Sequence, residues 1–190
     1  MASNKSSAYV LEAREKAAEG ALKLMLMRSP LRIGVPPNHV YVHQRCSEVV
    51  LEALEPFCPL KWERLIDVTM GLGAGFSGMG EVCGAVVGYI IASGLDLAAR
   101  YRDTTVLRIL GGRAAQKFMR DFAKEFGSTR CKEIIAPHDL SGYLTPGGEE
   151  MEIYEAFMKD TASQMKCWNA MRFAIMYPLP SEEQDLSPVR

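Results

Sequence analysis

The chain contains five cysteines, and their sulfur atoms are the groups in this sequence best suited to redox chemistry or metal binding. A thiolate is a nucleophile and also a ligand for zinc and iron. No two of the cysteines have the C-x-x-C spacing by which one tight turn presents two sulfurs to one ion. A shared site must therefore be assembled by tertiary packing, and the alternative for each cysteine is a buried, inert side chain. The cysteines are Cys46, Cys58, Cys83, Cys131 and Cys167.

Three of these cysteines fall in the first turn of a predicted helix. There, the unpaired backbone N–H groups and the positive end of the helix dipole favour a thiolate over a thiol. Cys46, Cys83 and Cys131 have this placement, whereas Cys167 is expected well inside the last helix. Basic residues that directly precede a cysteine would add positive potential; they are Arg45, Arg130 and Lys166.

The segment 71–88 reads GLGAGFSGMGEVCGAVVG and needs a physical reason for its glycines. Gly80, Gly84, Gly88 and Ala92 recur every four residues, which predicts a bare stripe against which another helix can pack closely. Glycine-rich backbone also supplies N–H donors to negative charge, so Gly80 and Gly84 are expected to lie beside a cofactor or its sulfur ligands. A dinucleotide-binding loop is not expected, because that fingerprint needs a preceding strand.

Apolar residues recur at helical spacing throughout, and no segment alternates as a strand would. We expect an all-α fold: one compact bundle of about six to seven helices, with the glycine-rich loop before the central helix. The domain should span 1–177, with a frayed or surface tail at 178–190. The expected helices are 6–28, 45–55, 59–69, 81–94, 104–126, 128–135 and 149–176.

Local signals mark some of the helix ends. Thr104 or Thr105 can cap the helix 104–126, and Ser128 can cap the next one. Gly111 and Gly112 are expected to kink or split the long helix.

The charge balance excludes several classes of partner. With 22 basic and 23 acidic residues the formal net charge is −1, so neither nucleic acid nor an anionic membrane is an expected partner. The longest nearly uncharged stretch, 82–95, is too short to cross a bilayer. No secretory signal is evident at the N-terminus. We therefore expect a cytoplasmic protein, and a homodimer that could use the helix 6–28.

The cysteine motifs together resemble a known family. Cys46 in RCSEVVLEAL, the hexad CGAVVG at 83–88, Cys131 in FAKEFGSTRCKEI and Cys167 resemble the redox-active family defined by C, CGAxxG, C and C. The resemblance covers about residues 40–175. A related helical domain occurs in split-Soret cytochrome c, where cysteines are associated with an iron–sulfur centre. The chain has no C-x-x-C-H, so covalent haem is not expected.

The resemblance implies that Cys46, Cys83, Cys131 and Cys167 converge. Four thiolates suit a [2Fe–2S] or [4Fe–4S] cluster, and we expect a redox protein that transfers electrons to an unidentified partner protein. Cys58 matches no family position and is interpreted as a structural thiol. Two alternatives stay open: a thiol–disulfide oxidoreductase that uses cysteine pairs without metal, and a helical interaction module with structural zinc.

Other candidate residues are interpreted conservatively. His39 and His43 are four residues apart, but loop or surface positions are favoured over a place near the cluster or on a non-covalent haem. His138 can form a hydrogen-bonded pair in a loop, and Glu81 is interpreted as a capping acid. The methionines are interpreted mostly as core filler, and a copper site is a minor alternative.

Overall fold

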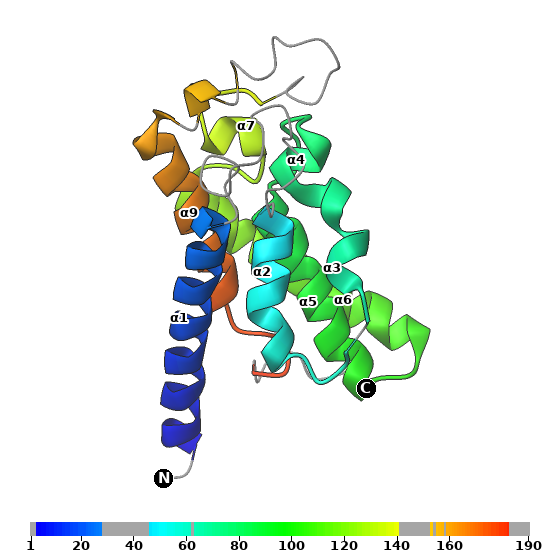
Figure 1. Ribbon diagram of the computed structural model, residues 1–190. Helices are drawn as coiled ribbons and strands as arrows, with labels where there is room; N and C mark the ends of the chain where they lie inside the picture. Colours follow the sequence, from blue (N-terminus) through cyan, green and yellow to red (C-terminus); the bar gives the residue numbers. More distant parts are fainter. Residues whose placement is uncertain are drawn as a thin grey trace.

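The computed structural model describes residues 3–27, 46–61, 63–140 and 153–182 apart from 154 and 158. Within those ranges the chain contains helices and no strand, which confirms the all-α prediction; the one isolated bridge pairs Val82 with Arg130. Figure 1 shows the arrangement. The α-helices are α1 (Ser3–Met27), α2 (Cys46–Leu54), α3 (Leu65–Val68), α4 (Gly73–Ser77), α5 (Gly84–Arg100), α6 (Thr104–Phe126), α7 (Cys131–Ile134) and α9 (Thr161–Met176), and the 3-10 helices are η2 (Glu55–Phe57) and η3 (Met70–Leu72).

Helix α5 is the apolar centre of the bundle, and it packs against α2, α6 and α9. The predicted glycine stripe explains its close approach to α2. A Cβ on Gly88 would lie 2.8 Å from the Ser47 carbonyl oxygen and 2.9 Å from the Val50 Cβ. Gly84 also faces α2, but Gly80 precedes the helix and so is not part of the stripe.

An aromatic cluster joins α5, α6 and the end of α9. The rings of Tyr89 and Phe118 stack with centroids 3.9 Å apart, and Tyr177 meets both of them edge-on. Phe173 and Phe122 extend the cluster in a T-shaped pair with centroids 5.8 Å apart. Aromatic pairs stabilise a fold beyond the burial of their apolar area. These contacts therefore hold the end of α9 against α5 and α6.

Two predictions about α6 are wrong. Its N-cap is Asp103, not Thr104 or Thr105, because the aspartate carboxylate accepts a hydrogen bond from the Thr105 N–H at 2.7 Å. The helix also continues through Gly111 and Gly112 without a break, since flanking turns and packing outweigh the weak helix propensity of glycine.

Other helix boundaries also differ from prediction. Asp160 caps α9 through the N–H groups of Ala162 and Ser163, so α9 begins at Thr161 inside the expected helix 149–176. The cap predicted at Ser128 is wrong as well, because the N-cap of α7 is Arg130 and no side chain caps this helix. The Ser128 hydroxyl accepts from the Arg130 N–H, and α7 starts only at Cys131. Helix α5 runs on to Arg100, beyond the expected end at residue 94.

Methionines are not uniformly core filler. Met171 is buried, but Met79 and Met165 are exposed, because the turn before α5 and the outer side of α9 carry them to the surface. Among the helices that the structure describes, none has the length and apolar character needed to cross a bilayer.

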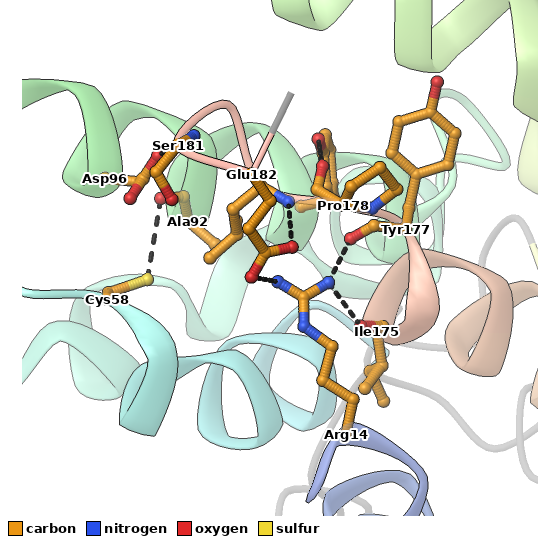
Figure 2. Close-up of polar contacts among 11 residues, drawn as sticks. Arg14, Cys58, Ala92, Asp96, Ile175, Tyr177, Pro178, Ser181 and Glu182 are labelled. Carbon is orange, nitrogen blue, oxygen red and sulfur yellow. Dashed lines mark hydrogen bonds and ion pairs between the residues drawn. The ribbon is translucent and has the colours of Figure 1, made fainter. Parts of the chain in front are cut away.

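A buried arginine ties α1 to the C-terminal segment, as Figure 2 shows. Arg14 is only 1% exposed. Its guanidinium donates to the carbonyl oxygens of Ile175, at 3.3 Å, and Tyr177, and it pairs with Glu182 at 2.9 Å. Because a buried guanidinium is costly without partners, these contacts hold α1 against the end of α9.

The first residues of the expected tail are packed rather than frayed. Leu179 is fully buried, and the Ser181 N–H donates to the Asp96 carboxylate at 2.7 Å. The prediction of a loose tail from residue 178 is therefore wrong for 178–182, since these residues supply apolar area and partners that α5 and α1 need. Residues 183–190 lie outside the described ranges.

Replacing Arg14 tests this contact. Arg14→Ala should lower the free energy of unfolding by about 2–4 kcal/mol, because it removes the buried cation that pairs with Glu182 and the donor to the carbonyl groups of Ile175 and Tyr177. Chemical denaturation measures the change. The matched control is Arg172→Ala, which removes an exposed ion pair with Glu15 and should cost no more than about 1 kcal/mol. Equal losses in the two variants would contradict the assigned role of Arg14.

Candidate functional site

The structure places three cysteines at helix starts, as predicted. Cys46 is the first residue of α2, Cys83 is the N-cap of α5, and Cys131 is the first residue of α7. Cys167 lies inside α9, also as predicted. In Figure 1 the start of α2 lies at the same end of the bundle as α4 and α7. Elements distant in sequence thus bring their sulfurs to one region.

The four cysteines are close enough to affect one another electrostatically. Each of the six pairs among Cys46, Cys83, Cys131 and Cys167 interacts strongly enough for charge on one sulfur to raise the pKa of another. The first three are buried and Cys167 is partly exposed. No disulfide joins any of the four in the part of the chain that the structure describes.

Cys46 is the sulfur that carries negative charge most easily. The Cys83 thiol donates a hydrogen bond to it, and this bond is the main reason that the pKa of Cys46 is lowered to about 7. Burial opposes the charge, but backbone N–H groups of Ala74, Gly84 and Ser47 also donate to the sulfur and stabilise the thiolate.

The other three thiols resist ionisation. The hydrogen bond to Cys46, followed by burial, raises the pKa of Cys83 well above its usual range. Burial is the main cause for the others: the pKa of Cys131 rises to about 12, and that of Cys167 also rises well above its usual range. Without a bound cation, the site therefore favours a single negative charge. Holding four thiolates would require a positively charged group such as a metal centre.

Two glycines allow the backbone to approach the cysteines. A Cβ on Gly84 would lie 2.3 Å from the Cys46 Sγ, and one on Gly75 would lie 2.8 Å from the Cys131 Cβ. Gly80 is placed differently: its nearest neighbours are the side chains of Lys132 and Asp139. Of the two glycines predicted to line a cofactor site, Gly84 contacts a sulfur and Gly80 faces α7.

Helix α4 is a left-handed turn, which the sequence pattern did not predict. The φ angles are +52° at Ala74, +66° at Gly75, +61° at Phe76 and +53° at Ser77. Non-glycine residues adopt this conformation at a cost of about 1 kcal/mol or more each. The run of glycines in the sequence indicated an unusual backbone, but an alanine, a phenylalanine and a serine in it gave no signal of left-handed geometry.

Two backbone hydrogen bonds hold Cys83 beside Cys131. The Cys83 N–H donates to the Thr129 carbonyl at 2.8 Å, and the Cys131 N–H donates to the Glu81 carbonyl at 2.6 Å. The donor in each bond is the N–H group of a cysteine. The two bonds therefore tie the connection between α4 and α5 to the start of α7. Two residues per segment are too few to produce the alternating pattern by which a strand is predicted.

The described basic side chains next to the cysteines in sequence bind carboxylates and a backbone carbonyl. Arg130 pairs with Glu81 at 2.9 Å and with Glu133 at 3.3 Å, and Lys166 donates to the Ala136 carbonyl at 2.8 Å. The expectation that these cations favour the thiolates is therefore not supported by their contacts. The capping role predicted for Glu81 is also wrong, since its carboxylate binds Arg130 and α5 has no side-chain cap.

The histidine candidates have no described contact with the cysteines. His138 bonds to the Asp160 carboxylate at 2.9 Å, which joins a loop to the start of α9. Hydrogen bonds from Ser163 and then His138 lower the pKa of Asp160 to about 2. Three candidates fall outside the described residues: Arg45, His39 and His43.

Cys58 is separate from the other four cysteines. It is buried, and its thiol donates to the Ala92 carbonyl at 3.6 Å, as Figure 2 shows. Burial, with a smaller contribution from the charge of Asp96, raises its pKa to about 11. These contacts are those of a structural thiol, and Cys58 provides an internal control for the other four.

The donor set fits a thiolate-bound metal centre in its chemistry. Four sulfurs lie near enough to raise one another's pKa, and backbone N–H groups stabilise charge on one of them. In the described ranges no three side chains of Cys, His, Asp or Glu are arranged around a position for a single ion. One zinc ion would need sulfurs about 3.8 Å apart, given a Zn–S distance of about 2.3 Å. A cluster of several irons holds its thiolates farther apart than a single zinc ion does. The lack of a position for a single ion therefore does not argue against a cluster.

The structure thus combines an all-helical bundle with three cysteines at helix starts and a fourth inside α9. The chain belongs to the family described as "Putative redox-active protein (C_GCAxxG_C_C)", whose profile matches residues 44–176. The family's motif is GCAxxG, with glycine before cysteine, so the motif CGAxxG given above is this chain's order and not the family's: residues 83–88 read CGAVVG. No curated protein and no solved structure matches significantly. The relation to split-Soret cytochrome c therefore stays a prediction.

The charge on Cys46 can be tested in the metal-free, reduced chain. Ultraviolet absorbance of thiolates should show one group ionising near pH 7, because donors stabilise only this sulfur. Cys46→Ser should abolish that step, and Cys58→Ser should leave it unchanged. Thiolate formation only near the ordinary thiol value of 9.0 would contradict the assignment.

The close approach at Gly84 can be tested by adding one methyl group. Gly84→Ala should lower the free energy of unfolding by about 1–3 kcal/mol, because the new Cβ collides with the Cys46 sulfur. Gly94→Ala in the same helix meets no atom within 4 Å and should stabilise the chain by about 0.4–1 kcal/mol. Similar effects at both positions, measured by denaturation, would argue against the contact.

Proposed function

We propose that this chain binds an iron–sulfur cluster through Cys46, Cys83, Cys131 and Cys167 and transfers electrons. The observation that carries this proposal is the mutual electrostatic influence of four sulfurs from four separate elements. A thiol pair alone would explain two of them, whereas a cluster needs four ligands. When bound, such a cluster supplies one-electron redox chemistry.

The chain's own residues would orient and insulate that group. Ala74, Gly84 and Ser47 direct N–H groups at the Cys46 sulfur, which stabilises negative charge there. Burial of Cys83 and Cys131 keeps water from their sulfurs. Cys167 is the one of the four that is not fully buried as a residue, although its thiol is enclosed enough for burial to raise its pKa. The side of α9 that carries it is therefore the shortest route for electrons to the surface.

The proposal includes a cellular compartment and an oligomeric state, namely the cytoplasm and a homodimer. A reducing compartment such as the cytoplasm suits a site built from free thiols. A homodimer through α1 would have to use its outer face, where Tyr9 and Leu11 are exposed, because Ala18 and Ala21 are buried.

A second candidate function is thiol–disulfide exchange by Cys46 and Cys83. The specific observation is the hydrogen bond between these two side chains, with one sulfur ionised near neutral pH. The Cys46 thiolate would attack the disulfide of an oxidant, and Cys83 would then attack the resulting mixed disulfide. Two electrons and two protons thus pass from the pair to the oxidant and reduce its disulfide to two thiols. This function leaves Cys131 and Cys167 without a role.

Metal analysis of single-cysteine variants distinguishes the two candidates. The chain, purified without oxygen or reconstituted with ferrous iron and sulfide, should contain iron and acid-labile sulfide and absorb visible light. Cys46→Ser, Cys83→Ser, Cys131→Ser and Cys167→Ser should each lose most of the iron. Cys58→Ser should retain it, because Cys58 bonds to Ala92 and not to the other sulfurs.

A colourless, iron-free chain after reconstitution would contradict the cluster. If mass spectrometry then showed reversible pairing of Cys46 with Cys83, the exchange function would replace it. Retention of iron by Cys131→Ser and Cys167→Ser together would also contradict a site of four ligands.

A further inference from the structure

Helix α4 contacts two of the four cysteines although it contains none. A Cβ on Gly84 would lie 2.3 Å from the Cys46 Sγ and 3.1 Å from the Gly73 Cα, so the start of α4 lies beside the Cys46 sulfur. The Ala74 N–H there stabilises negative charge on that sulfur. One residue later, Gly75 lies so close to Cys131 that its missing Cβ would be 2.8 Å from the Cys131 Cβ. The turn therefore lies between a cysteine of α2 and a cysteine of α7.

Hydrogen bonds hold α4 in its left-handed conformation. The Gly78 N–H donates to the Ala74 carbonyl, and the Glu81 N–H donates to the Gly75 carbonyl, both at 3.1 Å. A relaxed right-handed turn would direct the Ala74 N–H elsewhere. A strained conformation that persists at non-glycine residues marks a segment whose geometry is needed.

The same segment is joined to the start of α7. The Lys132 N–H donates to the Gly80 carbonyl at 3.2 Å, and the Cys131 N–H donates to the Glu81 carbonyl at 2.6 Å. Cys131 is thus fixed to the end of the segment whose beginning donates to Cys46. Any change in the turn alters the separation of these two sulfurs.

We propose that α4 is a positioning element that fixes Cys46 relative to Cys131 and, through the Ala74 N–H, sets the reduction potential of the centre. The proposal rests on the proposed cluster function and adds residues outside the cysteine motifs. Hydrogen bonds to ligand sulfurs stabilise the more negatively charged, reduced state, so they raise the potential. Losing the Ala74 contact should lower it.

The first experiment measures midpoint potentials of the iron-loaded chain and three variants. Gly75→Ala should shift the potential to more negative values, because its Cβ has no room and its φ of +66° disfavours a side chain. Ala74→Gly keeps the N–H and suits a left-handed φ, so it should leave the potential unchanged. The matched control is Gly71→Ala, whose Cβ would meet only the Ser77 hydroxyl at 3.6 Å.

The second experiment needs no cluster. Hydrogen exchange of the Ala74 amide in the metal-free chain should be about tenfold faster in Cys46→Ala than in the unmodified chain, because the amide loses its acceptor. Cys58→Ala should leave the rate unchanged. Unchanged exchange of the α6 amides would show that both variants stay folded.

The outcomes separate this proposal from the cluster proposal. An iron-loaded chain whose potential is the same in Gly75→Ala would overturn only the positioning role. Equal Ala74 exchange in Cys46→Ala and the unmodified chain would overturn it as well, whether or not Gly75→Ala folds. A chain that takes up no iron would overturn the cluster and the effect on its potential together.

Discussion

The central constraint in this molecule is the stabilisation of a charged sulfur, that of Cys46, where water cannot reach it. Desolvation disfavours the thiolate strongly, so it needs donors at short range. The structure supplies the Cys83 thiol and three backbone N–H groups. Backbone donors come from helix starts and from the left-handed turn α4, which explains why the glycine-rich segment adopts a strained path rather than a simple loop.

The rest of the bundle keeps those donors in place. Helix α5 carries the Cys83 cap and the Gly84 N–H, and its bare surface at Gly88 lets α2 pack directly against it. Helix α1 lies outside the residues that match the family, yet Arg14 ties it to the end of α9. The added helix therefore stabilises the bundle.

Sequence reasoning reached the local features of the site and missed the long-range ones. The positions of Cys46, Cys83 and Cys131 at or near helix starts and the close packing of Gly84 follow from residue type and spacing. Hydrogen bonds from the Gly78 and Glu81 N–H groups close the left-handed turn, and the turn places the Ala74 N–H beside Cys46, a residue far earlier in the sequence. The burial of Arg14 likewise depends on residues at the other end of the chain, and a single sequence does not reveal such partners.

The thiols that resist ionisation separate the two candidate functions. A disulfide-exchange centre needs one reactive thiolate and one partner, which Cys46 and Cys83 provide. Burying Cys131, with a pKa raised to about 12, beside that pair adds nothing to exchange, because a neutral, buried thiol is a poor nucleophile. The same burial suits a ligand, since a bound cationic centre displaces the proton and its charge offsets the lost hydration. Cys131 and Cys167 are therefore the residues that favour a four-sulfur centre over a thiol pair.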